Sequence, residues 1–135
     1  MRDLLRPGAQ DGLGDISVLA LAHVGDAVFE LMARTWLCGN GAATAKKLHS
    51  GAVGLASAKA QAAAVERILP ELGEEEMAVY KRGRNAHVST APRASTHGEY
   101  HASTGIEALF GHLYLSGRTE RLNELFRIVI RNYEF

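Results

Sequence analysis

The 135-residue sequence has one cysteine, no net charge and no long apolar run. A single cysteine, Cys38, cannot form an intramolecular disulfide, which fits a reducing compartment. A membrane span needs roughly 18 uncharged apolar residues, and Asp26 and Glu30 interrupt the best candidate. The charged amino terminus is not followed by an apolar segment of signal length. We therefore expect a soluble cytoplasmic protein without a membrane segment.

The charges balance, with 15 lysines and arginines against 15 aspartates and glutamates. Long-range attraction to a polyanion therefore cannot come from net charge, and any nucleic-acid binding must use a local basic patch. The length suits one compact domain. We expect residues 1–135 to form that domain, with residues 1–14 as a flexible amino-terminal segment.

Apolar residues recur at helical spacing, and no sustained alternation, hairpin signal, internal repeat or low-complexity tract is present. The sequence predicts a long polar loop over 87–100. It predicts about six helices, over residues 16–36, 43–52, 57–69, 74–84, 103–115 and 119–133. The predicted fold class is all-α.

Two carboxylates lie among small and apolar residues on predicted helices: Asp26 within His23–Val28, and Glu107 within Thr104–Leu109. Gly25 costs a helix interior about 1 kcal/mol relative to alanine, which indicates that another helix crosses closely beside Asp26. Burying a carboxylate is costly unless positive charge meets it. If the two helices cross, both acids can share a divalent cation, which predicts a metal-dependent hydrolase acting on a phosphodiester.

Two acids suffice for such a site, because Mg²⁺ takes one or two carboxylates beside waters and substrate phosphate. Each acid also has an ordinary alternative, in which a hydrogen bond or an arginine satisfies it. Glu30 lies one turn before Arg34, which favours an intrahelical ion pair. His23 and His112 lack companion ligands at zinc spacing, so we interpret them as core or surface histidines.

The segment Leu19–Val28, which contains Gly-Asp-Ala, resembles the signature of the ribonuclease III family, and Ile106–Gly111 resembles the family's second acidic element. The resemblance spans about residues 16–127. Three further segments are similar to the mini-ribonuclease III branch, which lacks a double-stranded-RNA-binding domain: Ala56–Ala62, Lys81–Ala86 and Leu113–Gly117.

This resemblance implies an endoribonuclease that uses Mg²⁺, or Mn²⁺ as an alternative, with Asp26 and Glu107 as catalytic residues and metal ligands. It implies a two-fold homodimer with the signature helix at the interface. The implied substrate is double-stranded RNA, in this branch precursor 23S ribosomal RNA of the large subunit, hydrolysed to 5′-phosphate ends. A large-subunit ribosomal protein is the implied assisting partner.

The sequence departs from the larger family at acidic positions. Leu19 and Ala22 stand where the signature helix usually carries acids, and Thr104 stands where an aspartate usually precedes Glu107. The mini branch is similar in lacking these acids. Thr104 either orients a water through its hydroxyl or caps the start of its helix. A second hypothesis is therefore a catalytically weak or inactive double-stranded-RNA-binding module of the same fold, and a third is a helical protein-interaction domain.

Duplex RNA is recognised through its shape, phosphates and 2′-hydroxyls, for which basic and polar side chains suffice. Residues 81–101 carry four lysines or arginines against a single acid, Glu99. A second basic patch consists of Lys46, Lys47 and His49, and for both patches a solvated polar surface is the alternative. The residues predicted to bind RNA in the first patch are Lys81, Arg82, Arg84, Asn85 and Arg93.

Overall fold

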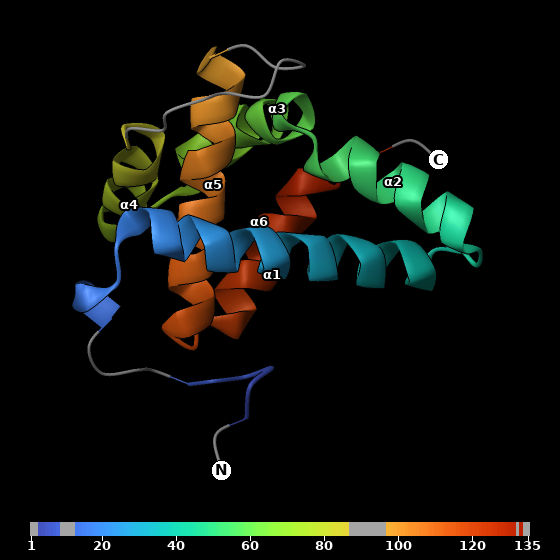
Figure 1. Ribbon diagram of the computed structural model, residues 1–135, viewed down its shortest axis with the longest axis horizontal. Helices are drawn as coiled ribbons and strands as arrows, with labels where there is room; N and C mark the ends of the chain where they lie inside the picture. Colours follow the sequence, from blue (N-terminus) through green and yellow to red (C-terminus); the bar gives the residue numbers. More distant parts are fainter. Residues whose placement is uncertain (1–2, 9–12, 87–96, 132, 134–135) are drawn as a thin grey trace.

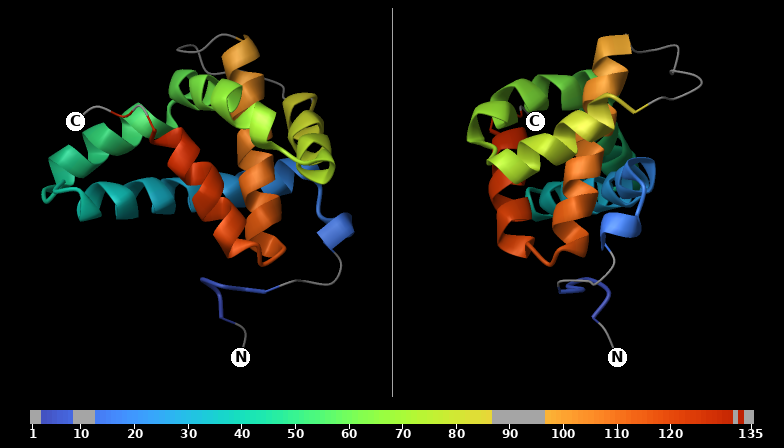
Figure 2. Two further views of the ribbon diagram at one scale, coloured as in Figure 1. Left: turned by 180° about the vertical axis from the view of Figure 1, so that it is seen from behind. Right: turned by 90° about the vertical axis from the view of Figure 1, so that its left-hand side faces the viewer.

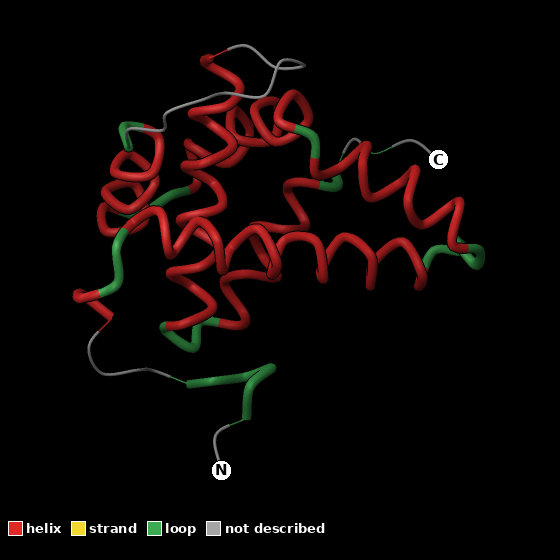
Figure 3. The backbone as a smooth tube through the Cα atoms, in the orientation of Figure 1, coloured by secondary structure: helices red, strands yellow, loops and turns green. Residues whose placement is uncertain are grey.

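Figure 1 presents a computed structural model that describes residues 3–8, 13–86, 97–131 and 133. Within these ranges all regular structure is helical, as Figure 3 shows, so the predicted all-α class is confirmed. None of the described helices is both long and apolar enough to cross a membrane. The elements in chain order are η1 (Leu13–Asp15), α1 (Val18–Gly39), α2 (Ala45–Ala56), α3 (Ala58–Ile68), η2 (Leu69–Glu71), α4 (Glu74–Arg84), α5 (His97–Leu115) and α6 (Thr119–Val129).

Side-chain hydroxyl groups cap the amino-terminal ends of α1, α2 and α3. The hydroxyl of Ser17 accepts a hydrogen bond from the Ala20 amide at 3.1 Å, and Thr44 caps α2 in the same way. The predicted cap at Ser57 is confirmed, since its hydroxyl accepts from the Ala60 amide at 3.2 Å. In α4 the acids of the first turn and the basic residues of the last turn match the helix dipole, as predicted.

Helix α5 runs through the middle of the molecule, where α1, α3, α4 and α6 pack around it (Figures 1 and 2). Most of its residues from Ser103 to Leu113 are buried. Phe110 of α5 lies 5.3 Å from Phe29 of α1 between ring centroids, and Phe29 lies 5.7 Å from Phe126 of α6. The three rings join α1, α5 and α6 into one hydrophobic core.

Two glycines allow α1 and α5 to cross with their backbones in contact. A Cβ atom at Gly25 would overlap the carbonyl oxygen of Glu107 and lie 2.8 Å from the amide nitrogen of Gly111. A Cβ atom at Gly111 would overlap the carbonyl oxygen of Leu21. The close helix crossing predicted at Gly25 is therefore confirmed, and its partner is the helix that carries Glu107.

Helix α5 begins at His97, well before the predicted start at Ser103. Thr104 therefore lies inside the helix, and the alternative in which it caps the helix is wrong. Its hydroxyl donates to the Tyr100 carbonyl at 3.1 Å, while the Ser103 hydroxyl donates to the side chain of Gln61 on α3. These tertiary and local partners allow a polar segment that resembles a loop to continue as a helix.

The other predicted boundaries shift by a few residues. Helix α2 covers Ala45–Ala56 where 43–52 was predicted, α1 extends to Gly39, and α6 ends at Val129 before the predicted 133. The predicted loop 87–100 is helical from His97 onward, and its part 87–96 lies outside the described residues. The amino-terminal segment 1–14 is described only at 3–8 and 13–14.

Two ion pairs stabilise the outer helices, one within α1 and one between α4 and α6. Arg34 and Glu30 form the predicted intrahelical pair at 2.6 Å. Sequence reasoning missed a second pair, in which the buried carboxylate of Glu76 on α4 accepts from Arg121 of α6 at 2.8 and 2.9 Å. This hydrogen bonding with Arg121 lowers the pKa of Glu76 despite the opposing effect of burial. The Glu76 carboxylate also accepts from the Gly73 amide at the start of α4.

We expect Gly25→Ala to reduce the free energy of unfolding by about 3 kcal/mol or more, because backbone atoms of α5 cannot yield to the added methyl group. The control is Gly54→Ala in α2, where an added Cβ meets no atom within 4 Å. There alanine should leave stability unchanged or raise it by up to about 1 kcal/mol. Urea denaturation measures both, and equal stability of the two variants would contradict the crossing.

Candidate active site

The crossing of α1 and α5 places the side chains of Asp26 and Glu107 next to each other. Asp26 directly follows Gly25, whose Cα faces the backbone carbonyl of Glu107. The two carboxyl groups are close enough to share a hydrogen bond. Asp26 is exposed and Glu107 is partly buried, so the pair opens to solvent on the side of α1.

The electrostatic environment of Asp26 and Glu107 disfavours the ionisation of both carboxyl groups at once. Burial, together with the hydrogen bond to Asp26 and the charge on Asp26, raises the pKa of Glu107 to about 8. Near neutral pH the Glu107 carboxyl group therefore keeps its proton. Neither acid has an arginine or lysine partner among the described ion pairs. The alternative in which an arginine satisfies them finds no support in the part of the chain that is described.

The donor set fits a hard divalent cation. Carboxylate oxygens are ligands that Mg²⁺ prefers, and a cation would replace the proton on Glu107. The described residues contain no group of three or more histidine, cysteine, aspartate or glutamate side chains that could hold a metal ion. Two carboxylates thus leave most coordination positions to water or substrate oxygens, as Mg²⁺ sites commonly do.

Two buried polar residues, Ser103 and Thr104, lie one turn before Glu107 on α5. The Thr104 hydroxyl is buried, and its hydrogen is engaged by the Tyr100 carbonyl, so its oxygen can only accept a further hydrogen bond in this conformation. Ser103 pairs with Gln61, which is almost fully buried and whose amide nitrogen has no partner among the described residues. Sequence reasoning missed Gln61; a long polar side chain within an alanine-rich helix was the available signal.

Three of the predicted RNA-binding residues line one groove. Lys81, Arg82 and Asn85, at the end of α4, enclose an open groove of about 610 Å³ with Gly14–Val18 at the start of α1. From Val18 to Asp26 the helix rises about 12 Å, so the groove lies two turns from the carboxyl pair. Its position puts basic and amide donors beside the amino-terminal end of α1.

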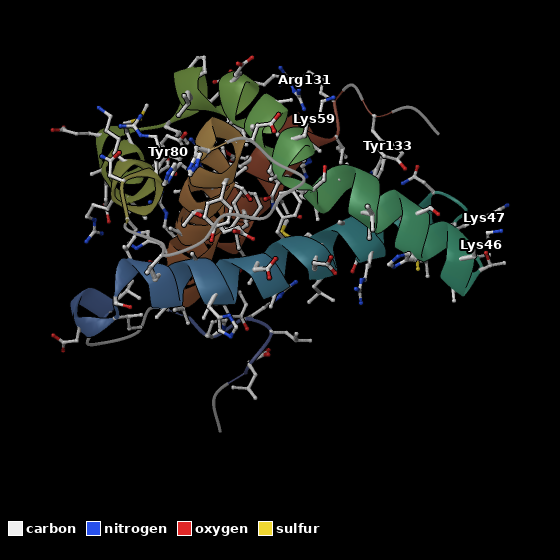
Figure 4. All side chains as sticks on the ribbon, turned by 45° about the horizontal axis from the view of Figure 1, so that its top comes forward. Lys46, Lys47, Lys59, Tyr80, Arg131 and Tyr133 are labelled. Atoms are coloured by element: carbon white, nitrogen blue, oxygen red, sulfur yellow. The ribbon has the colours of Figure 1, made fainter. Side chains whose placement is uncertain are left out.

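The remaining predicted residues lie elsewhere. The Arg84 guanidinium stacks over the Tyr80 ring at 5.8 Å and donates to Asn85 at 3.2 Å, rather than lining the groove. Arg93 lies outside the described residues. Lys46 and Lys47 lie in the first turn of α2, at the opposite end of α1, as Figure 4 shows. The structure thus separates the two predicted patches.

Comparison with known proteins identifies this arrangement. The family model described as the ribonuclease III domain matches residues 19–118, a range that includes both carboxylates and α4. The chain belongs to the ribonuclease III family. The fold agrees, since the crystal structure of a Fusobacterium nucleatum protein, 33% identical, matches with a TM-score of 0.80 over 87% of this chain and 96% of that one.

The relatives narrow the assignment to the mini-ribonuclease 3 branch. Mini-ribonuclease 3 of Symbiobacterium thermophilum is 44% identical over 109 residues, which cover 81% of this chain and 84% of the relative. Mini-ribonuclease 3 of Clostridium tetani is 37% identical over 123 residues, covering 90% and 82%. The protein is therefore an endoribonuclease of ribonuclease III type, from a family that typically uses Mg²⁺.

We expect Glu107→Gln to be more stable than the wild type at alkaline pH in metal-free buffer. Unfolding lets Glu107 ionise at its ordinary pKa of 4.5, whereas the folded protein resists ionisation up to about pH 8. Wild-type stability should therefore fall as pH rises from 4.5 to 8, by at most about 1.4 kcal/mol per unit from this group, and then level off.

Thermal unfolding between pH 4 and 9 measures the effect. The stability advantage of Glu107→Gln should be absent at pH 4 and largest above pH 8. The exposed Glu66 supplies a control, because Glu66→Gln should show no such pH-dependent gain. An advantage of Glu107→Gln that stays constant with pH would mean that the pKa of Glu107 is not raised in the folded protein.

Proposed function

We propose that this protein hydrolyses double-stranded RNA with Asp26 and Glu107 as catalytic residues that together hold Mg²⁺. The observation that carries the proposal is the contact between two carboxyl groups without a basic partner, at a helix crossing that fixes them. Membership in the mini-ribonuclease 3 branch supports it. The proposed substrate is precursor 23S ribosomal RNA in the cytoplasm, and the proposed assisting partner is a large-subunit ribosomal protein.

The proposed mechanism uses the pair as a rigid ligand set. A bound Mg²⁺, or Mn²⁺ in its place, would acidify water and stabilise negative charge on the phosphoryl oxygens. To act as a ligand Glu107 would give up its proton, and the positive charge of the cation would offset the repulsion between the two carboxylates. Helices hold both oxygens in place, whereas loop carboxylates would wander. The Thr104 oxygen, one turn before Glu107, accepts a hydrogen bond and so orients a water beside the pair.

The groove at the end of α4 is the proposed binding site for the RNA backbone next to the cleaved bond. Lys81 and Arg82 supply positive charge and Asn85 supplies an amide, all beside the start of α1. Such groups bind phosphates and 2′-hydroxyls without reading base sequence. Arg84, held over Tyr80, and Arg93 extend this basic surface in the proposal.

The protein is proposed to act as a two-fold homodimer, because cutting both strands of a duplex requires two sites. An apolar groove of about 490 Å³ lies along α1, lined by Val24, Ala27, Val28 and Leu31 together with Leu122 of α6. Leu31 is 55% exposed within it, an unfavourable state for a large apolar side chain. Pairing with a second copy across this face would bury these residues.

The enzymatic proposal is tested by incubating duplex RNA with the protein and Mg²⁺. We expect Asp26→Asn and Glu107→Gln each to lower kcat by more than about 100-fold, since metal catalysis contributes several kcal/mol. Both variants should still retard the duplex on a gel. Glu30→Gln, which removes the acid one turn after Asp26 and its pair with Arg34, is the matched control and should retain activity.

One result of this assay would contradict the enzymatic proposal. If the wild-type protein and both variants leave the RNA intact while retarding it equally, the chain is a binding module of this fold and not a nuclease.

The dimer proposal predicts that Leu31→Glu converts the protein to monomers, because a carboxylate would be buried without a partner in the apolar interface. The matched control is Val53→Glu on α2, where the side chain is 53% exposed and lies outside the groove. Sedimentation equilibrium distinguishes the states. Identical masses for the two variants would exclude this face of α1 as the interface.

A further inference from the structure

A long part of this neutral chain contains no acid. Residues 31–65, from the second half of α1 through α2 into α3, hold Arg34, Lys46, Lys47, Lys59 and His49 but no aspartate or glutamate. All 15 acids therefore lie in the remaining 100 residues. Such segregation creates local positive potential without changing the net charge, and it is the condition for binding a polyanion here.

The structure exposes this charge along one edge of the molecule. Lys46, Lys47 and Lys59 are exposed, as is Arg131, which follows α6. In Figure 4 the two lysines of α2 lie at its outer end, whereas Lys59 lies at the start of α3. We call these four residues the basic edge. The acids nearest to it in sequence are Glu66, two turns after Lys59, and Glu134, outside the described residues.

A groove beside the basic edge offers hydrogen-bond donors of the kind that bind phosphate. It has a volume of about 640 Å³, and none of the described residues that line it is an acid. Its lining includes Lys46 and Lys47, the side chains of Asn40 and Ser50, and the Thr44 cap of α2. The positive end of the α2 dipole adds to the lysine charges at this point. Leu37 and Tyr133 also line the groove, so the lysines, the amide and the hydroxyls are the groups there that can bind phosphate.

The basic edge is too far from the carboxyl pair to contact the cleaved phosphate. From Asp26 to Gly39 the helix rises about 20 Å, and α2 begins beyond that point. The groove of Lys81 and Arg82 lies about 12 Å from Asp26 in the opposite direction. Asp26 therefore lies between two basic regions at the two ends of α1, an arrangement that suits an extended polyanion.

We propose that the basic edge is a second phosphate-binding surface, which holds the flanking backbone of the same RNA duplex and makes efficient cleavage depend on duplex length. The inference rests on the proposed function. Lys46, Lys47 and Lys59 bind the duplex electrostatically and take no part in the reaction, so they affect KM and leave kcat unchanged.

The test compares Lys46→Gln/Lys47→Gln/Lys59→Gln with a control of equal charge change, Arg6→Gln/Arg118→Gln/Arg127→Gln. The control arginines are exposed, and two of them line a groove that also contains four glutamates. On a long duplex, we expect the lysine variant to raise KM more than about fivefold, and to flatten the slope of log affinity against log salt by about one for each lysine.

The control should keep the wild-type slope, and a truncated duplex that ends before the basic edge should show the same KM for the wild-type and lysine variants. An unchanged salt slope in the lysine variant overturns the proposal, as does an equal loss on both duplexes. Binding of polyglutamate through these lysines, with RNA affinity unaffected, also overturns it and assigns the surface to an acidic protein. Failure of the wild type to cut RNA would refute the nuclease proposal separately, because the salt slope is measured by binding alone.

Discussion

The contact between the backbones of α1 and α5 is the constraint on which the rest of the molecule depends. Gly25 and Gly111 remove the side chains that would hold the helices at an ordinary separation, and the carbonyl of Glu107 lies against Gly25. Because Asp26 directly follows Gly25, the same contact fixes where both carboxyl groups lie. The phenylalanine cluster behind the crossing then stabilises the approach through burial of large rings.

The crossing also creates an unfavourable interaction. Burial of the Glu107 carboxyl group, together with the neighbouring exposed Asp26, raises the pKa of Glu107 to about 8. A protein selected only for stability would replace one of the acids, whereas one that binds a cation gains from the same arrangement when the cation arrives. The remaining helices compensate elsewhere, for example through the pair of Glu76 with Arg121, which joins α4 to α6.

Local signals made much of this predictable from sequence. Ser57 as a cap, the acidic and basic ends of α4, and a glycine inside a long helix each have a direct physical meaning, and the structure agrees with all three. The predictions that were wrong depend on contacts that a local stretch of sequence does not reveal. Helix α5 starts early because Ser103 bonds to the buried Gln61 and Thr104 to its own preceding turn, and neither partner is visible in a window of sequence. The groove beside the start of α1 could not be predicted either, because it exists only where α4 packs against α1.

The spacing of the two basic regions depends on the same helix, α1. A chain without net charge cannot attract RNA over long distances, so any recognition must act at short range. At physiological salt, screening confines each surface charge to about 8 Å, which is less than the roughly 12 and 20 Å that separate Asp26 from the two basic regions. Each region therefore acts on its own part of a bound polymer. The length of α1, and not the summed charge of the protein, sets the spacing between these contacts.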